Sequence, residues 1–255
     1  MLISEKLRNP ENLLLAMAFI MPLVFSVWMA MLNNFVIEQA NFTGIEIGIL
    51  QSLREIPGFL AFTAIYVLLF IKEQKLALLS LGLTSLGVAA TGFFPSVVGL
   101  YLTTVIMSVG FHYFETVNQS LTLQWISKDK TAHFLGRALS VKSIASLLAF
   151  GSIWVLMEQF EWSYQATYLL FGGIALVFTI ALVISFPSFV PPVEQSRRLI
   201  LRKRYLLFYA LTFFSGARRQ IFVVFAGFLM VEKFNYSVAD VSALFMINYV
   251  FNWLF

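Results

Sequence analysis

Charged side chains inside apolar stretches are the residues of this sequence best suited to chemistry. Arg218 and Arg219 are adjacent, and they lie in a stretch that is otherwise uncharged from Tyr205 to Val231. An arginine at the centre of a bilayer costs about 2.5 to 3.5 kcal/mol on insertion scales, so it is tolerated only beside water, an acidic partner or an anion. We expect at least one of the two to face a cavity. The alternative is an ion pair that clamps two helices together.

A second group consists of His112, Glu115 and Gln119, which are spaced by three and four residues. On a helix this spacing places them on one polar stripe, as expected of a cavity wall. Glu115 lies 14 residues before Asp129, and Lys142 lies 13 residues after it, so the two side chains could pair across a helical hairpin. As a hypothesis, Glu115 carries a coupling proton whose affinity is set by burial and by Lys142.

A third group, Arg54 and Glu55, precedes Pro57 and Gly58, two residues that predict a bend in a helix. A pair of charges beside such a bend could form a gate. The alternative is that both residues pair with neighbouring side chains and only stabilise the fold.

The composition indicates the class of protein whose helices must position these charged groups. Of the 255 residues, 60% are hydrophobic and 12% are charged, and the mean hydropathy is +0.84. Soluble domains carry about 25% charged residues, so the sequence predicts a membrane protein. With two histidines and no cysteine, metal ligands beyond His112 and Glu115 are hard to find, and we predict no metal and no cofactor. The sequence contains no nucleophile elbow, phosphate loop or zinc-protease motif, and we predict that the protein is not an enzyme.

A helix needs about 20 apolar residues to cross the hydrocarbon layer, and the sequence contains seven complete runs of suitable length. These runs are Leu13–Ile37, Gly44–Ile71, Leu76–Phe94, Ser96–Ile126, Ala132–Met157, Ser163–Phe186 and Tyr205–Val231. An eighth run begins near Ser237 and reaches Phe255, and we interpret it as cut off. The first run is too long for the core of a signal peptide and lacks a small-residue cleavage site, so we expect it to be retained as a span.

The distribution of Lys and Arg predicts the topology, because short cytoplasmic loops carry an excess of both. If every run crosses once, one side of the membrane holds twelve basic residues and the other holds Lys233 alone. The twelve are Lys6, Arg8, Lys72, Lys75, Lys128, Lys130, Arg137, Arg197, Arg198, Arg202, Lys203 and Arg204. The N-terminus is therefore predicted to be cytoplasmic. The remaining basic residues, 17 − 13 = 4, lie inside spans and are Arg54, Lys142, Arg218 and Arg219.

The sequence also contains an internal repeat. A shift of 194 residues places the start of the seventh run on the start of the first without a gap. Identical pairs are Leu13 and Leu207, Ala16 and Ala210, Phe19 and Phe213, Glu38 and Glu232, Asn41 and Asn235, and Leu50 and Leu244. Thr43 with Glu46, and Ser237 with Asp240, are matching capping boxes that predict helix starts. Six helices plus a loop thus form the repeating unit, as expected of a carrier built from two halves.

With these features the chain resembles the major facilitator superfamily of secondary transporters. The resemblance rests on the cytoplasmic N-terminus, the six-helix half, the repeat and the basic connector from Pro187 to Arg204. It implies an all-α, polytopic helical bundle, with a six-helix half at 1–186, a connector at 187–204 and the first helices of the second half at 205–255. The family has twelve helices, so the chain would be about two thirds of a transporter. The family's signature Asp-Arg loop between helices 2 and 3 is missing, since "FIKEQKLAL" stands there.

In that family helices 1, 4, 7 and 10 line the central cavity, with help from 2, 5, 8 and 11. The intramembrane charges of this chain fall on helices 2, 4, 5 and 7 of the predicted order, as this arrangement implies. The substrate-binding candidates are Arg218, Arg219, Arg54, Lys142 and Gln119, and the proton-coupling candidates are Glu115, His112 and Glu55. Four basic against two acidic core residues, Glu55 and Glu115, leave a charge of +2, which favours an anionic or zwitterionic solute.

The predicted function is secondary active transport of a small solute by alternating access, as a symporter or antiporter, with protons as the coupling ion. The alternative is a sensor derived from a transporter, which binds a solute without moving it. The expected partners are the solute and the lipid bilayer, and no nucleic acid. We expect a monomer in the bacterial inner membrane.

Overall fold

The computed structural model describes residues 5–190 and 202–254, and within these ranges all side chains except those of residues 6, 217–223 and 252–254. This part of the chain is built of helices and contains no strand. The α-helices are α1 (Pro10–Ala40), α2 (Gly44–Phe59), α3 (Ala64–Val67), α4 (Glu73–Thr91), α5 (Val97–Trp125), α6 (Lys128–Glu158), α7 (Tyr164–Ser185), α8 (Leu206–Phe234) and α9 (Val238–Leu254). Short 3-10 helices lie at Glu5–Leu7, Ala61–Thr63 and Lys203–Tyr205.

Every predicted apolar run is helical, and the second run is broken as its Pro57 and Gly58 predict. Pro57 lacks a backbone N–H, so one helical hydrogen bond is lost. The helix α2 continues through Pro57 and ends at Phe59, and a 3-10 turn and the single-turn helix α3 complete the run. Among the described residues, four helices, α1, α5, α6 and α7, are long and apolar enough to span a membrane, and α9 is a shorter apolar helix. The protein is an all-α polytopic membrane protein.

The two capping boxes form as predicted. Thr43 accepts a hydrogen bond from the backbone of Ile45, while Glu46 accepts one from the backbone N–H of Thr43 at 2.8 Å. The carboxylate of Asp240 accepts from the backbone N–H of Ser237 at 2.9 Å in the same way. The preceding helices also end alike, because Asn41 and Asn235 both adopt left-handed backbone with φ of 53° and 55°. The conformation of these turns therefore repeats together with the sequence.

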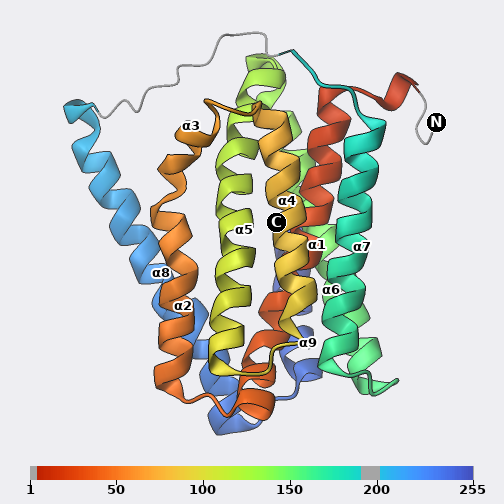
Figure 1. Cartoon of the computed structure of the whole chain (residues 1–255), viewed down its shortest axis with the longest axis vertical. Coiled ribbons are helices and arrows are strands. Elements are labelled where there is room, and N and C mark those ends of the chain that lie inside the picture. Colours follow the sequence, from red (N-terminus) through yellow and green to blue (C-terminus); the bar gives the residue numbers. More distant parts are fainter. Residues whose placement is uncertain (1–4, 191–201, 255) are drawn as a thin grey trace.

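The helices form a bundle whose connections alternate between two ends (Figure 1). The N-terminus, the α3–α4 and α5–α6 turns and the segment after α7 lie at one end, which we call the connector end. The α1–α2, α4–α5, α6–α7 and α8–α9 turns lie at the other, which we call the far end. The basic residues Arg8, Lys72, Lys75 and Lys128 thus share the connector end, as the topology predicts.

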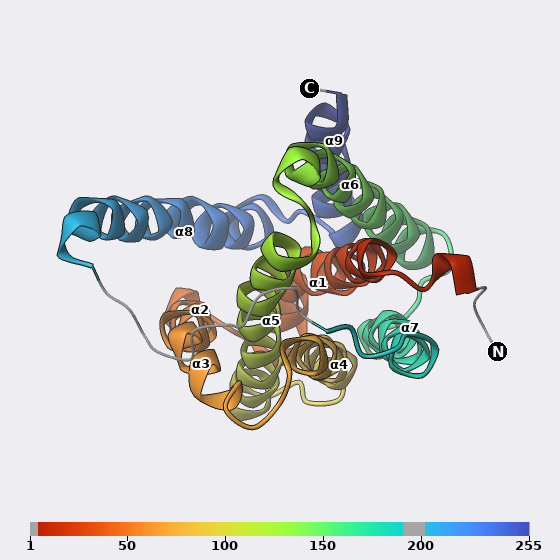
Figure 2. The ribbon, with the colours of Figure 1, turned by 90° about the horizontal axis from the view of Figure 1, so that it is seen from above.

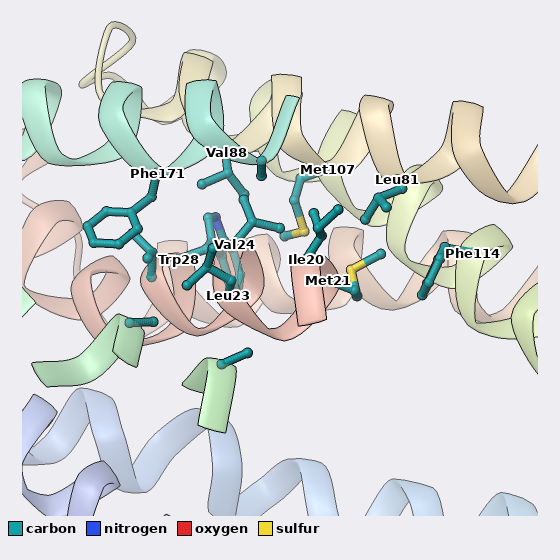
Figure 3. Close-up of a cluster of buried hydrophobic side chains, with 14 of the residues drawn as sticks. Ile20, Met21, Leu23, Val24, Trp28, Leu81, Val88, Met107, Phe114 and Phe171 are labelled. Atoms are coloured by element: carbon teal, nitrogen blue, oxygen red, sulfur yellow. The ribbon is translucent and has the colours of Figure 1, made fainter. Parts of the chain in front are cut away.

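Helix α1 lies at the centre of the bundle. Seen along the bundle, α4, α5 and α7 lie on one side of α1, and α6 and α9 lie on the other (Figure 2). Buried side chains cover α1 all round, which explains why its sequence is apolar on every face. Trp28 and Met21 of α1 lie in one packed core with Val88 of α4, Met107 of α5 and Phe171 of α7 (Figure 3).

Small residues allow the helices of this core to approach closely. A Cβ atom at Gly110 of α5 would lie 2.5 Å from the backbone of Thr84 in α4, and one at Gly172 of α7 would lie 2.5 Å from the backbone of Ala89. On α6, Ala145 and Ala149 are fully buried, and small residues of this kind let helices pack closely. The two glycines thus let α5 and α7 pack closely on α4, and this packing supports the polar residues of α5.

Candidate functional site

The predicted site residues lie on four helices. Arg54 and Glu55 are on α2, the stripe of His112, Glu115 and Gln119 is on α5, and Lys142 is on α6. The backbone of residues 218 and 219 is part of α8, but the side chains of Arg218 and Arg219 lie outside the described residues, so their predicted orientation stays untested.

Arg54 and Glu55 form an ion pair with each other. Nη2 of Arg54 donates to Oε1 of Glu55 at 2.6 Å, and Nε donates to the same oxygen at 3.0 Å. The guanidinium group lies 5.7 Å from the centre of the Trp28 ring, within the range of a cation–π contact. The side chain of Arg54 is 8% exposed and that of Glu55 is 39% exposed. The arginine is thus buried between α1 and α2, and it holds a carboxylate that remains partly accessible.

Helix α5 contacts the part of α2 that carries this pair. The Ser108 hydroxyl donates a hydrogen bond to the backbone carbonyl of Arg54. One turn later the half-buried His112 ring packs on Gly58, where a Cβ atom would lie 2.7 Å from Cε1 of the ring. The imidazole interacts electrostatically with both Glu55 and Arg54. We call Arg54, Glu55 and His112 the α2/α5 cluster; glycine at position 58 is what permits its close approach.

Aromatic rings surround the α2/α5 cluster, and sequence reasoning did not single them out. Phe25 of α1 stacks on Phe111 of α5, with ring centroids 4.3 Å apart and planes inclined by 17°. Trp28 lies 6.0 Å from Phe25, and Phe111 meets His112 edge to face at 5.1 Å. The chain has 28 phenylalanines, so an aromatic residue type alone carries no signal for a site. Only the packing of α1 against α5 brings these rings together.

The predicted pairing of Glu115 with Lys142 is wrong. In the part of the chain that the structure describes, no ion pair joins the two residues, although both are half-buried. The reason is that α6 packs mainly against α1 and α9 and hardly touches α5 beyond the turn between them. Gln119, at the connector-end side of the stripe, is exposed. The stripe therefore leaves the α2/α5 cluster after His112.

The first turn of α4, which follows the segment that connects α3 with α4, forms contacts of its own at the connector end. Glu73, the first residue of α4, accepts hydrogen bonds from Gln124 and, at 3.0 Å, from Ser120 of α5. The neighbouring Gln74 donates to the carbonyl of Pro187 and accepts from the N–H of Phe189, both at 2.9 Å. The start of the connector is thus fastened to the first half of the chain.

Helix α8 is packed in one half and free in the other. Toward the far end, Val224, Phe228 and Val231 are 6% or less exposed. Toward the connector end, Leu207, Leu211 and Phe214 are more than 60% exposed, and α8 runs away from the bundle (Figures 1 and 2).

Two asparagines of α1 contact α8 and the turn that follows it at the far end. The Asn34 amide donates to the carbonyl of Tyr236 at 2.7 Å, and a Cβ atom at Gly227 would lie 2.8 Å from Nδ2 of Asn33. Together with the packed half of α8, these contacts close the far end.

Comparisons with known proteins identify solved structures of the same fold. No protein-family model and no curated protein matches the sequence. The crystal structure of the nucleoside transporter NupG matches with a TM-score of 0.70 at 17% identity, over 95% of this chain and 64% of that one. An auto-inhibited POT family peptide transporter matches with a TM-score of 0.51 at 11% identity, over 94% and 51%. The chain thus spans 64% and 51% of these transporters, and it shares their fold.

Proposed function

We propose that the protein is a secondary active transporter of the major facilitator type that moves a small solute by alternating access. The observation that carries the proposal is the contact pattern of α8, which packs on α1 and α2 at the far end and separates from them at the connector end. Two halves that touch at one end and part at the other enclose a path that is open on one side, as rocking around a central site requires. The folds of NupG and the peptide transporter support this reading.

The domain division that we propose follows the predicted repeat. Residues 1–186 form a six-helix half, in which α2 and α3 together make one broken helix, and 187–204 form the connector. Residues 205–255 begin the second half. The matching turns after α1 and α8, with left-handed Asn41 and Asn235, support this division. We propose further that the connector end is cytoplasmic, because it carries the basic loops, that the membrane is the bacterial inner membrane and that the protein is a monomer.

We propose the α2/α5 cluster as the centre of the solute site and of proton coupling. An ion pair with a partly exposed carboxylate can release one partner when a proton or a solute binds the other, and the His112 ring lies beside this pair. Glu115 remains a coupling candidate without the predicted help of Lys142.

The proposed solute is a small organic molecule. The sequence favours an anion or zwitterion, but Glu55 neutralises Arg54, so this preference now depends on Lys142, Arg218 and Arg219. The nucleoside and peptide transporters of similar fold suggest which solutes to screen first.

Two measurements test the proposal. Because the chain has no cysteine, Ser215→Cys in α8 and Ile174→Cys in α7 can each be probed with a membrane-impermeant thiol reagent, in the protein expressed from its own gene. We expect labelling at 215 and none at 174, since Ser215 would line the open path and Ile174 would face lipid. No labelling at either position contradicts a water-filled path.

Solute flux into proteoliposomes then separates transport from sensing, because a sensor binds solute without flux.

A further inference from the structure

A groove lies between α2 and α8, beside the α2/α5 cluster. It has a volume of about 720 Å³, and its wall includes Gln51, Glu55, Ile56 and Phe59 of α2 and Val224 and Phe225 of α8. The wall is mostly apolar, and Glu55 is the one charged side chain among its described lining residues. The groove therefore offers a ligand an apolar surface with few polar groups, which is the usual character of a small-molecule site.

The side chain of Gln51 is a polar group in the wall of this groove, and the packing of the helices does not explain why it is there. The residue is 8% exposed, and in the described part of the chain its Oε1 atom has no hydrogen-bond partner. A buried acceptor without a donor is unfavourable, and native proteins keep few of them. Since Gln51 lies one helical turn before Glu55 on the same face of α2, the two side chains line the groove together.

The carboxylate of Glu55 carries little net charge as seen from the groove. Arg54 is bound to it at 2.6 Å and is itself buried against Trp28, and it is not among the described residues that line the groove. An anion in the groove would face a carboxylate. A cation would compete with the charge-assisted hydrogen bonds from Arg54, which are among the stronger interactions of this kind. A neutral donor satisfies both acceptors without disturbing the ion pair.

We propose that this groove binds an uncharged, largely apolar solute that donates hydrogen bonds to Gln51 and Glu55. The exposed rings of Phe59 and Phe225 suit a planar solute, because aromatic faces stack with ring centroids about 4.5 to 7 Å apart. The inference rests on the proposed transport function, and it names a solute class different from the anion that the sequence favours.

Four compounds that share one ring test the solute class. Benzamide is neutral and has two donors, N,N-dimethylbenzamide is neutral and has none, benzoate is an anion and benzylammonium is a cation. The readout is the rate at which N-ethylmaleimide modifies a single cysteine in the groove, Ser52→Cys, in the purified protein. Gly48→Cys is a second position, since nothing lies within 4 Å of a Cβ atom there. We expect benzamide to slow the modification at lower concentrations than the other three.

Gln51→Leu tests the recognition directly. Removing an acceptor that contributes a typical hydrogen bond should raise the half-protecting concentration of benzamide about fivefold. The matched control is Gln165→Leu, at an exposed position in the first turn of α7, and it should change nothing. Equal protection by N,N-dimethylbenzamide, or an unchanged value in Gln51→Leu, overturns the proposal.

Further outcomes separate this inference from the transport function. Stronger protection by benzoate or benzylammonium than by benzamide overturns the proposed solute class. A cysteine at position 52 or 48 that does not react at all means that another protein segment covers the groove, and this also overturns it. Solute flux without any protection leaves transport intact and removes the groove site. Protection without flux of any solute supports the groove site and contradicts transport.

Discussion

Two groups of intramembrane charges flank α5, and they are held in different ways. In the α2/α5 cluster, Arg54 and Glu55 are adjacent in sequence and bind each other, while α5 supports them through Ser108 and His112. On the other flank, Glu115 and Lys142 lie on helices that diverge, and no ion pair joins them in the described part of the chain. Two charged residues in one helical turn can bind each other as soon as the helix forms. Two charged residues on different helices can do so only if those helices pack against each other.

The largest effect that we expect comes from removing Arg54. Breaking a buried ion pair from one side costs about 3 to 5 kcal/mol, and because Glu55 is partly exposed we expect about 2 kcal/mol for Arg54→Met. The measurement is the thermal unfolding midpoint of the purified protein. The double variant Arg54→Met/Glu55→Gln should recover at least part of the loss, since no unpaired carboxylate remains. Equal midpoints for the single and double variants contradict an energetically coupled pair.

The response of transport to pH distinguishes the two groups in function. We expect Glu55→Gln to abolish the stimulation of uptake by an imposed proton gradient, because the exchangeable carboxylate of the cluster is lost. Glu115→Gln should leave most of the stimulation in place. The opposite result, with coupling lost only in Glu115→Gln, would return the role of proton carrier to Glu115 and remove it from the α2/α5 cluster.

A substitution at Gly58 tests how closely α2 and α5 pack, and its expected effect on stability is smaller. In Gly58→Ala the new methyl group would overlap the His112 ring, which costs about 1 kcal/mol and offsets the gain in helix propensity of about 0.5 to 1 kcal/mol. The matched change Gly48→Ala on the same helix meets no neighbour and should raise the unfolding midpoint. Uptake should fall in Gly58→Ala, because His112 is displaced. If both variants gain stability equally, the contact between Gly58 and His112 is loose.

The smallest effect is expected at the second group. A double-mutant cycle with Glu115→Gln and Lys142→Met should give an interaction energy of less than about 0.5 kcal/mol, the range of independent sites. The same cycle at Arg54 and Glu55 should give about 0.5 to 3 kcal/mol, the range of residues in contact. Unfolding midpoints of the four variants in each cycle supply both values. A clear coupling at Glu115 and Lys142 would mean that the two helices close on each other in the membrane.

The sequence by itself determined the helices of this protein and much of their order. Apolar runs and caps depend on residues close in sequence, so Thr43 with Glu46 and Ser237 with Asp240 predicted helix starts that the structure contains. Basic loops predicted a common end, and Pro57 with Gly58 predicted the break in the second run. Each of these features follows from local chemistry and from the thickness of a bilayer.

The tertiary structure alone decided which polar residues meet. Residues such as Phe25 and Phe111 are 86 positions apart, and their stacking depends on the packing of α1 against α5. Equal depth in the membrane suggested that Glu115 and Lys142 would pair, but depth does not say which way two helices lean, and α6 leans toward α1 and α9. Gln51 had no signal in the sequence, since only the groove between α2 and α8 shows that its buried acceptor lacks a donor among the described residues. Contacts between distant segments depend on the shapes of whole helix faces, which no local pattern records.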